Sequence, residues 1–145
     1  MKSAKHEILI LTDADCIPAS ENWILKMQAA FKDGIQIVLG YGAYKRKKGL
    51  LNRIIRFDTF HTALQYLSCA LAGQPYMGVG RNLAYKRELF FKQKGFAAHH
   101  HLPGGDDDLF INACATSENT AIVIDKDTFT YSTPPASIGE WISQK

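Results

Sequence analysis

Two aspartates separated by one residue, Asp13 and Asp15, follow a short apolar segment near the start of the chain. Residues 7–11 are mostly Ile and Leu without polar alternation, which is typical of a buried strand in an α/β sheet. Open α/β sheets bind ligands at the carboxyl ends of their strands, and carboxylate oxygens suit hard divalent cations. The pattern therefore predicts a metal site at this strand end; the alternative is a turn whose aspartates cap a following helix.

A second acidic group, residues 106–108, consists of three consecutive aspartates. Two glycines precede it and an apolar helical pattern follows it, so we expect its carboxylates on the first turn of a helix. There the helix dipole stabilises the ionised form. The simplest interpretation is a favourable capping run. However, three adjacent like charges repel one another, and such arrangements often accompany a functional need.

A basic segment precedes the longest predicted helix. Residues 44–56 hold six positive charges, at Lys45, Arg46, Lys47, Lys48, Arg53 and Arg56. From Leu50 to Ala72 apolar residues recur mostly three, four or seven apart, which predicts an amphipathic helix rather than a transmembrane span. The segment is either a solvated face or a surface for anionic lipid headgroups or a diphosphate.

Further elements must position these groups within one domain of 145 residues. We expect a helix from Ser20 that buries Trp23, Ile24, Met27 and Phe31, and buried strands at residues 35–39 and 119–124. We also expect an edge strand at residues 128–132 and a last helix capped by Ser137. Net charge is only +3, too small to indicate nucleic-acid binding, and three cysteines without a spacing pattern favour a reduced cytosolic setting.

Four segments now stand in one order: Thr-Asp-Ala-Asp ending at Asp15, Gly-Val-Gly-Arg-Asn-Leu-Ala-Tyr ending at Tyr85, Gly-Gly-Asp-Asp-Asp-Leu ending at Leu109, and Trp-Ile-Ser-Gln-Lys ending at Lys145. Together they resemble family 2 glycosyltransferases of the GT-A fold, over residues 7–145. The resemblance implies an α/β fold with a GT-A-like, Rossmann-like mixed sheet flanked by helices. It also implies a nucleotide-diphosphate sugar donor, a divalent cation (Mn²⁺ or Mg²⁺), and inverting transfer to the hydroxyl of a glycan or lipid-linked acceptor.

The resemblance assigns roles to individual residues. Asp13 and Asp15 match the DxD motif of the family: Asp15 would coordinate the metal that bridges the diphosphate, and Asp13 would assist with the ribose or the metal. The donor-binding residues it implies are Asp13, Gly80, Arg81, Asn82 and Gln144. Alignment on the pair Asp108-Leu109 puts the catalytic base on Asp106, but Gly105 replaces the usual Glu, so Asp107 is the second candidate.

The resemblance also implies a single glycosyltransferase-like domain, residues 1–145, that is truncated at both ends and lacks the N-terminal nucleotide-binding half of the family. The full-length enzyme is then expected in the cytoplasm, at the inner face of the cell membrane, with a peripheral anionic membrane contact. Two alternatives remain. One is a phosphohydrolase of the haloacid dehalogenase type, with Asp13 as nucleophile and Asp15 as acid/base. The other is a non-catalytic, truncated metal-binding domain.

Overall fold

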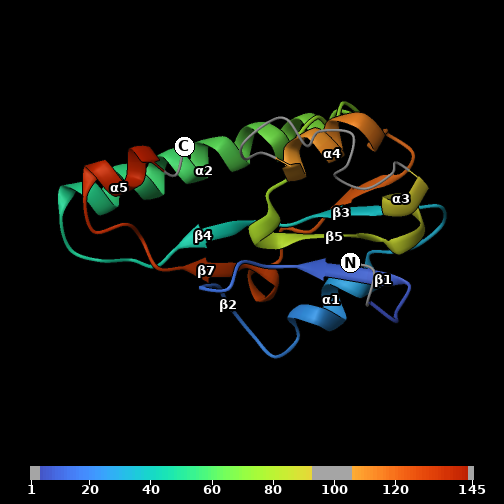
Figure 1. Cartoon of the computed structure of the whole chain (residues 1–145), viewed down its shortest axis with the longest axis horizontal. Coiled ribbons are helices and arrows are strands. Elements are labelled where there is room, and N and C mark those ends of the chain that lie inside the picture. The colour runs from blue at the N-terminus through green and yellow to red at the C-terminus, as the bar shows by residue number, and fades with distance from the viewer. Residues whose placement is uncertain (1–3, 93–105, 144–145) are drawn as a thin grey trace.

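A computed structural model describes residues 4–92 and 106–143 and contains two small β-sheets with helices packed around them (Figure 1). The larger sheet has four strands in the order β1 (Ile8–Leu11), β5 (Leu83–Lys86), β3 (Ile37–Leu39) and β6 (Thr120–Ile122). Strand β5 is antiparallel to both of its neighbours, whereas β3 and β6 are parallel. The predicted mixed α/β sheet is therefore confirmed.

The smaller sheet has three strands in the order β2 (Ile17–Pro18), β7 (Thr130–Ser132) and β4 (Gly42–Tyr44). Strand β7 pairs antiparallel with β2 and parallel with β4. It is thus the middle strand, and the prediction of an edge strand at residues 128–132 was wrong. The two prolines that follow it, Pro134 and Pro135, suggested an edge strand, whereas its partners β2 and β4 are distant in the chain.

Helices cover both faces of the larger sheet. Figure 1 shows α2 and α4 on one side and α1 on the other. The described α-helices are α1 (Trp23–Ala29), α2 (Leu50–Leu71), α3 (Arg87–Lys92), α4 (Asp106–Cys114) and α5 (Ile138–Ser143), with short 3₁₀ turns η1 (Gly80–Asn82) and η3 (Lys126–Thr128). Ser137 accepts a hydrogen bond from the amide of Glu140, as predicted for the cap of the last helix.

The core follows the alternation of the central strands. Ile37 and Leu39 of β3 belong to the cluster beneath α2 and α4, whereas Val38 between them packs with Trp23 and Met27 of α1. Successive side chains of a strand point to opposite faces, so each central strand contributes to both layers. The strand at residues 35–39 and the burial of Trp23 and Met27 are confirmed, but Ile24 is exposed.

The opening strand differs from its prediction. All four residues of β1 are partly exposed, because it lies at the edge of the sheet and pairs only with β5 among the described residues. A run of Ile and Leu does not reveal how many neighbours a strand has, since a half-covered edge strand and a central strand can share the same composition. The first helix also begins at Trp23, and Ser20 accepts the amide of Asn22 just before it.

Helix α2 has the predicted extent but not the predicted orientation. Of the apolar residues that recur along it, only Leu67 is buried; the others point outward, namely Leu50, Ile54, Phe57, Leu64 and Leu71. The face that packs on the sheet carries Ile55, Ala63 and Tyr66 instead. No described helix is both long enough and apolar enough to span a bilayer.

Candidate functional site

Three strand ends meet at one place in the larger sheet. Leu83, the first residue of β5, lies between two strand ends. It is paired with Leu11, the last residue of β1, on one side and with Leu39, the last residue of β3, on the other. Because β5 runs antiparallel to its neighbours, the turn that precedes it, η1, lies beside the residues that follow β1 and β3. This arrangement places η1 next to Asp13 and so joins the first and second segments of the predicted site.

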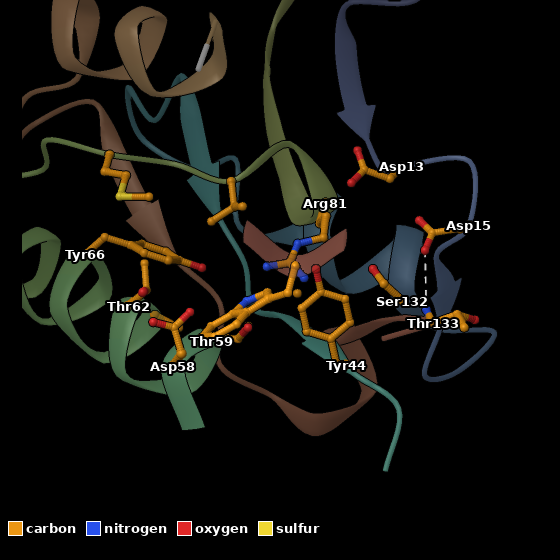
Figure 2. A pocket seen from close by; sticks show the side chains of 15 residues that line it. Asp13, Asp15, Tyr44, Asp58, Thr59, Thr62, Tyr66, Arg81, Ser132 and Thr133 are labelled. Carbon is orange, nitrogen blue, oxygen red and sulfur yellow. Dashed lines mark hydrogen bonds between the residues drawn. The ribbon is translucent and has the colours of Figure 1, made fainter. Parts of the chain in front are cut away.

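A cavity of about 530 Å³ opens at this junction (Figure 2). Its lining combines the acidic strand end, η1, the inner face of α2 and the end of β7, and includes Asp13, Asp15, Tyr44, Asp58, Thr59, Thr62, Tyr66, Arg81, Ser132, Thr133 and Trp141. A smaller hollow of about 310 Å³ is lined by Asp13, Gly78, Val79, Gly80, Arg81, Asp107 and Asp108. The two share Asp13, Val79 and Arg81, so five of the predicted site residues border adjoining spaces: Asp13, Asp15, Gly80, Arg81 and Asp107.

The aspartates after β1 form a cluster with the next residue. Ligand atoms of Asp13, Asp15 and Cys16 lie within 4.8 Å of one another, and both carboxylates are exposed. The backbone amide of Thr133 donates to Asp15 over 3.3 Å, and the Cys16 thiol shares a 2.9 Å hydrogen bond with the Ser132 hydroxyl. Two neighbouring carboxylates that face a cavity fit Mg²⁺ or Mn²⁺, which favour oxygen ligands.

Helix α4 brings the second acidic group to the same place. The Asp107 carboxylate lies directly against Gly80, so closely that a Cβ added to Gly80 would overlap its Oδ2 atom. Asp108 borders the same hollow. Its carboxyl accepts a hydrogen bond from the Gly78 backbone, and burial raises its pKa while this hydrogen bond opposes the shift. Both aspartates thus border the hollow, and Asp108 also connects α4 to the segment before η1.

Two predicted residues cannot be placed. Asp106 is the first residue of α4, but its side chain lies outside the described residues, and so does all of Gln144. The roles that the resemblance implies for them therefore stay predictions.

Arg81 extends from η1 into the cavity (Figure 2). Its guanidinium stacks 4.7 Å above the centre of the Tyr44 ring, and its Nη1 atom is buried without a hydrogen-bond partner among the described residues. A buried guanidinium nitrogen that the protein leaves unpaired is costly, and its planar donors match phosphate oxygens. The side chain is therefore set up for an anionic ligand.

Asn82, the neighbour of Arg81, points into the core instead. Its Oδ1 accepts a 3.1 Å hydrogen bond from the Trp23 indole, and its Nδ2 donates to the carbonyls of Tyr41 (3.0 Å) and Thr128 (2.7 Å). The residue is fully buried, and Gly40 leaves the space for it, because a Cβ there would lie 2.5 Å from the Asn82 side chain. We therefore assign Asn82 a positioning role for η1 rather than the direct donor contact implied by the motif.

No site role was predicted from the sequence for several residues of the cavity wall, among them Tyr44, Asp58 and Trp141. Tyr44 was only the first residue of the basic segment and Asp58 only a residue of the predicted helix from Leu50 to Ala72. Trp141 belonged to the fourth motif, but no role was assigned to it. One signal was available for Asp58, since it is the only carboxylate between Leu50 and Leu71. Nothing in the local sequence indicated that α5 would bring Trp141 to the cavity.

Comparisons with known proteins agree with this geometry at the level of fold. No family model matches the chain, and no curated protein matches it. Among solved structures, the mannosyltransferase PcManGT from Pyrobaculum calidifontis, in complex with GDP-Man and Mn²⁺, is similar over 97% of this chain, with a TM-score of 0.67 and 20% sequence identity. The chain covers 36% of that protein. It therefore has a glycosyltransferase fold of the GT-A type.

Proposed function

We propose that this chain carries the transfer site of a metal-dependent, inverting glycosyltransferase that uses a nucleotide-diphosphate sugar. The observation that carries the proposal is the meeting of Asp13, Asp15, Arg81 and Asp107 around two adjoining hollows at the strand ends. The similar mannosyltransferase holds GDP-Man and Mn²⁺, which supports the same class of donor and cation here. The glycosyltransferase fold leaves the phosphohydrolase alternative without structural support.

The donor half of the site would be electrostatic. Asp13 and Asp15 would hold the cation, which supplies charge neutralisation for a departing diphosphate. Arg81 would donate to a phosphate oxygen through its buried Nη1 atom, the group for which the protein offers no described partner. Its stacking on Tyr44 restricts the guanidinium plane, so the N–H groups of Arg81 are oriented before the ligand binds.

The acceptor half needs one base. In an inverting displacement the acceptor oxygen bonds to the anomeric carbon while that carbon loses its bond to the diphosphate oxygen, and the hydroxyl proton passes to a carboxylate. The sequence favoured Asp106 for this role. We now put Asp107 first, because its carboxylate borders the same hollow as Asp13 and Arg81. No covalent sugar intermediate is required, so one carboxylate base suffices.

The product distinguishes this function from its alternatives. We expect nucleoside diphosphate to be released from nucleotide-sugar donors such as GDP-mannose, in a reaction that depends on Mn²⁺ or Mg²⁺ and on an added acceptor. Release of inorganic phosphate from phosphate monoesters would instead indicate a phosphohydrolase. Binding of Mn²⁺ without any product, tested in the full-length protein, would indicate a non-catalytic metal-binding domain.

Cation binding can be tested without turnover. We expect Asp15→Asn to weaken Mn²⁺ binding, measured by isothermal titration calorimetry, by about tenfold or more, because a neutral amide replaces a charged oxygen ligand. Asp33→Asn is the matched control: Asp33 is exposed and has a φ of 40°, a conformation that Asn adopts readily. Equal Mn²⁺ affinity in the Asp15 variant and the control would show that the cation does not bind at this strand end.

We further propose that the protein belongs to the family 2 glycosyltransferases and works in the cytoplasm, at the inner face of the cell membrane, on a glycan or lipid-linked acceptor. The order of the four motifs supports the first proposal, and the basic segment before α2 supports the second. Fractionation of cells that express the full-length protein would test the location: recovery in the soluble fraction at low salt would contradict it.

A further inference from the structure

We propose that the outward face of α2 is a docking surface that lies on an anionic lipid bilayer. This face, called the outer face below, exposes six large apolar side chains: Leu50, Ile54, Phe57, Phe60, Leu64 and Leu71. The exposed fractions reach 67% for Phe57 and 71% for Leu50. The inference rests on the membrane location proposed above and names the surface that makes the contact; it does not involve the transfer site.

The helix is apolar on two opposite sides. Its inner face packs Ile55, Ala63 and Tyr66 against the sheet, yet it also carries the polar Asn52 and Thr59. The outer face is the more hydrophobic of the two. A helix that is apolar all round is normally covered on all sides. At 22 residues α2 is about 33 Å long. The apolar surface that it exposes is therefore far larger than that of a single exposed side chain.

The charges around the outer face indicate what covers it. Asp58 is the only carboxylate of α2, and it lines the cavity on another side of the helix. The outer face therefore carries no acidic residue, whereas Arg53 is exposed and follows the exposed basic residues Arg46, Lys47 and Lys48. Two copies packed through this region would bring like charges together. Anionic headgroups instead complement the bases while the acyl boundary receives the apolar side chains.

A second helix, α5, also exposes large apolar side chains. On α5, Ile138 and Ile142 are 60% and 65% exposed, and Trp141 between them reaches the cavity that Asp58 also lines. Figure 1 shows α5 near the N-terminal part of α2. The cavity wall thus joins the two helices. If the proposed function holds, docking would bring a headgroup-linked acceptor to the cavity; the docking itself does not depend on transfer.

Vesicle co-sedimentation tests the proposal. We expect the protein to bind vesicles that mix phosphatidylglycerol with phosphatidylcholine, and to bind less as salt is raised. The variant Phe57→Asp/Leu64→Asp should reduce the partition coefficient on the order of tenfold or more, since two apolar contacts are lost and two charges repel the headgroups. Leu25→Asp is the matched control, because Leu25 is 67% exposed on α1, which covers the other face of the sheet.

The substituted side chains are exposed, so unchanged circular dichroism and melting temperature should show that both variants fold. Equal binding to pure phosphatidylcholine vesicles, or an unaffected double variant, would overturn the proposal. So would a concentration-dependent dimer in analytical ultracentrifugation that the double variant disperses while vesicles bind neither protein, since the outer face would then be an interface between copies. Because no outcome uses sugar transfer, failure here would count against the membrane location and leave the proposed sugar transfer standing, and loss of transfer would leave the docking standing.

Discussion

If the proposed function holds, replacing Asp107 by Asn is expected to lower single-turnover sugar transfer by roughly two to four powers of ten at saturating donor and acceptor. The amide keeps the shape of the carboxylate but cannot accept the acceptor proton. Donor affinity should stay nearly unchanged, because the proposed cation ligands are on the other side of the hollow, after β1. A quenched-flow measurement of transfer, combined with a separate titration of donor binding, separates the two quantities.

Asp106→Asn is the matched variant, one residue earlier on the same helix. A shift of one residue turns a helical side chain by about 100°, so the carboxylates of Asp106 and Asp107 are expected to approach the reacting hydroxyl from different directions. We expect Asp106→Asn to retain most of the transfer rate. A severe loss in Asp106→Asn with an active Asp107→Asn would restore the assignment that the Asp108-Leu109 alignment favoured.

Replacing Asn82 by Leu is expected to reduce the free energy of unfolding by about 3–5 kcal/mol. Leu fills a similar volume but leaves the Trp23 indole N–H and the Thr128 carbonyl without the partner that Asn82 now provides. The Tyr41 carbonyl also loses Asn82 but keeps the backbone amide of Thr130. Each buried polar group that loses its hydrogen bond costs about 1–3 kcal/mol. The prediction needs no knowledge of the substrate, so it tests the structural role of η1 by itself.

Urea unfolding followed by circular dichroism measures this effect. Asn22→Leu is the control, since Asn22 is exposed and its side chain makes no capping hydrogen bond; it should change stability by less than about 0.5 kcal/mol. A double-mutant cycle with Trp23→Phe then isolates the indole contact, because part of the loss at Asn82 should disappear once the indole is absent. A stable Asn82→Leu variant would mean that the side chain is free to serve a ligand after all.

The sequence predicted best where the signal is local. Runs of apolar β-branched residues located β3, spacing located α2, and the aspartate run located the start of α4. Pairing between distant residues left no such trace. For example, β5 was not predicted at all, although Leu83 lies opposite the ends of two strands. Its sequence, Leu-Ala-Tyr-Lys, is too short to show a period, and only its place between β1 and β3 makes it a central strand.

The site was predictable in its parts but not in its geometry. The spacing of Asp13 and Asp15 identified the acidic pair, and the Gly-x-Gly-Arg-Asn segment identified the neighbourhood of Arg81. What spacing could not reveal is that Arg81 and Asn82, adjacent in the chain, point to opposite sides: one into the cavity and one into the core. The same limit explains α2. Its periodic leucines indicated an apolar face, but they did not indicate whether that face packs on the sheet or points outward.

The contact between Gly80 and Asp107 restricts how this protein can diverge. Any side chain at position 80 would force the Asp107 carboxylate out of its present place, so a mutation there should cost activity only where Asp107 has to keep that place. The two positions are therefore expected to be epistatic: in a library randomised at both, survivors with activity should hold Gly at 80 whenever they hold Asp at 107.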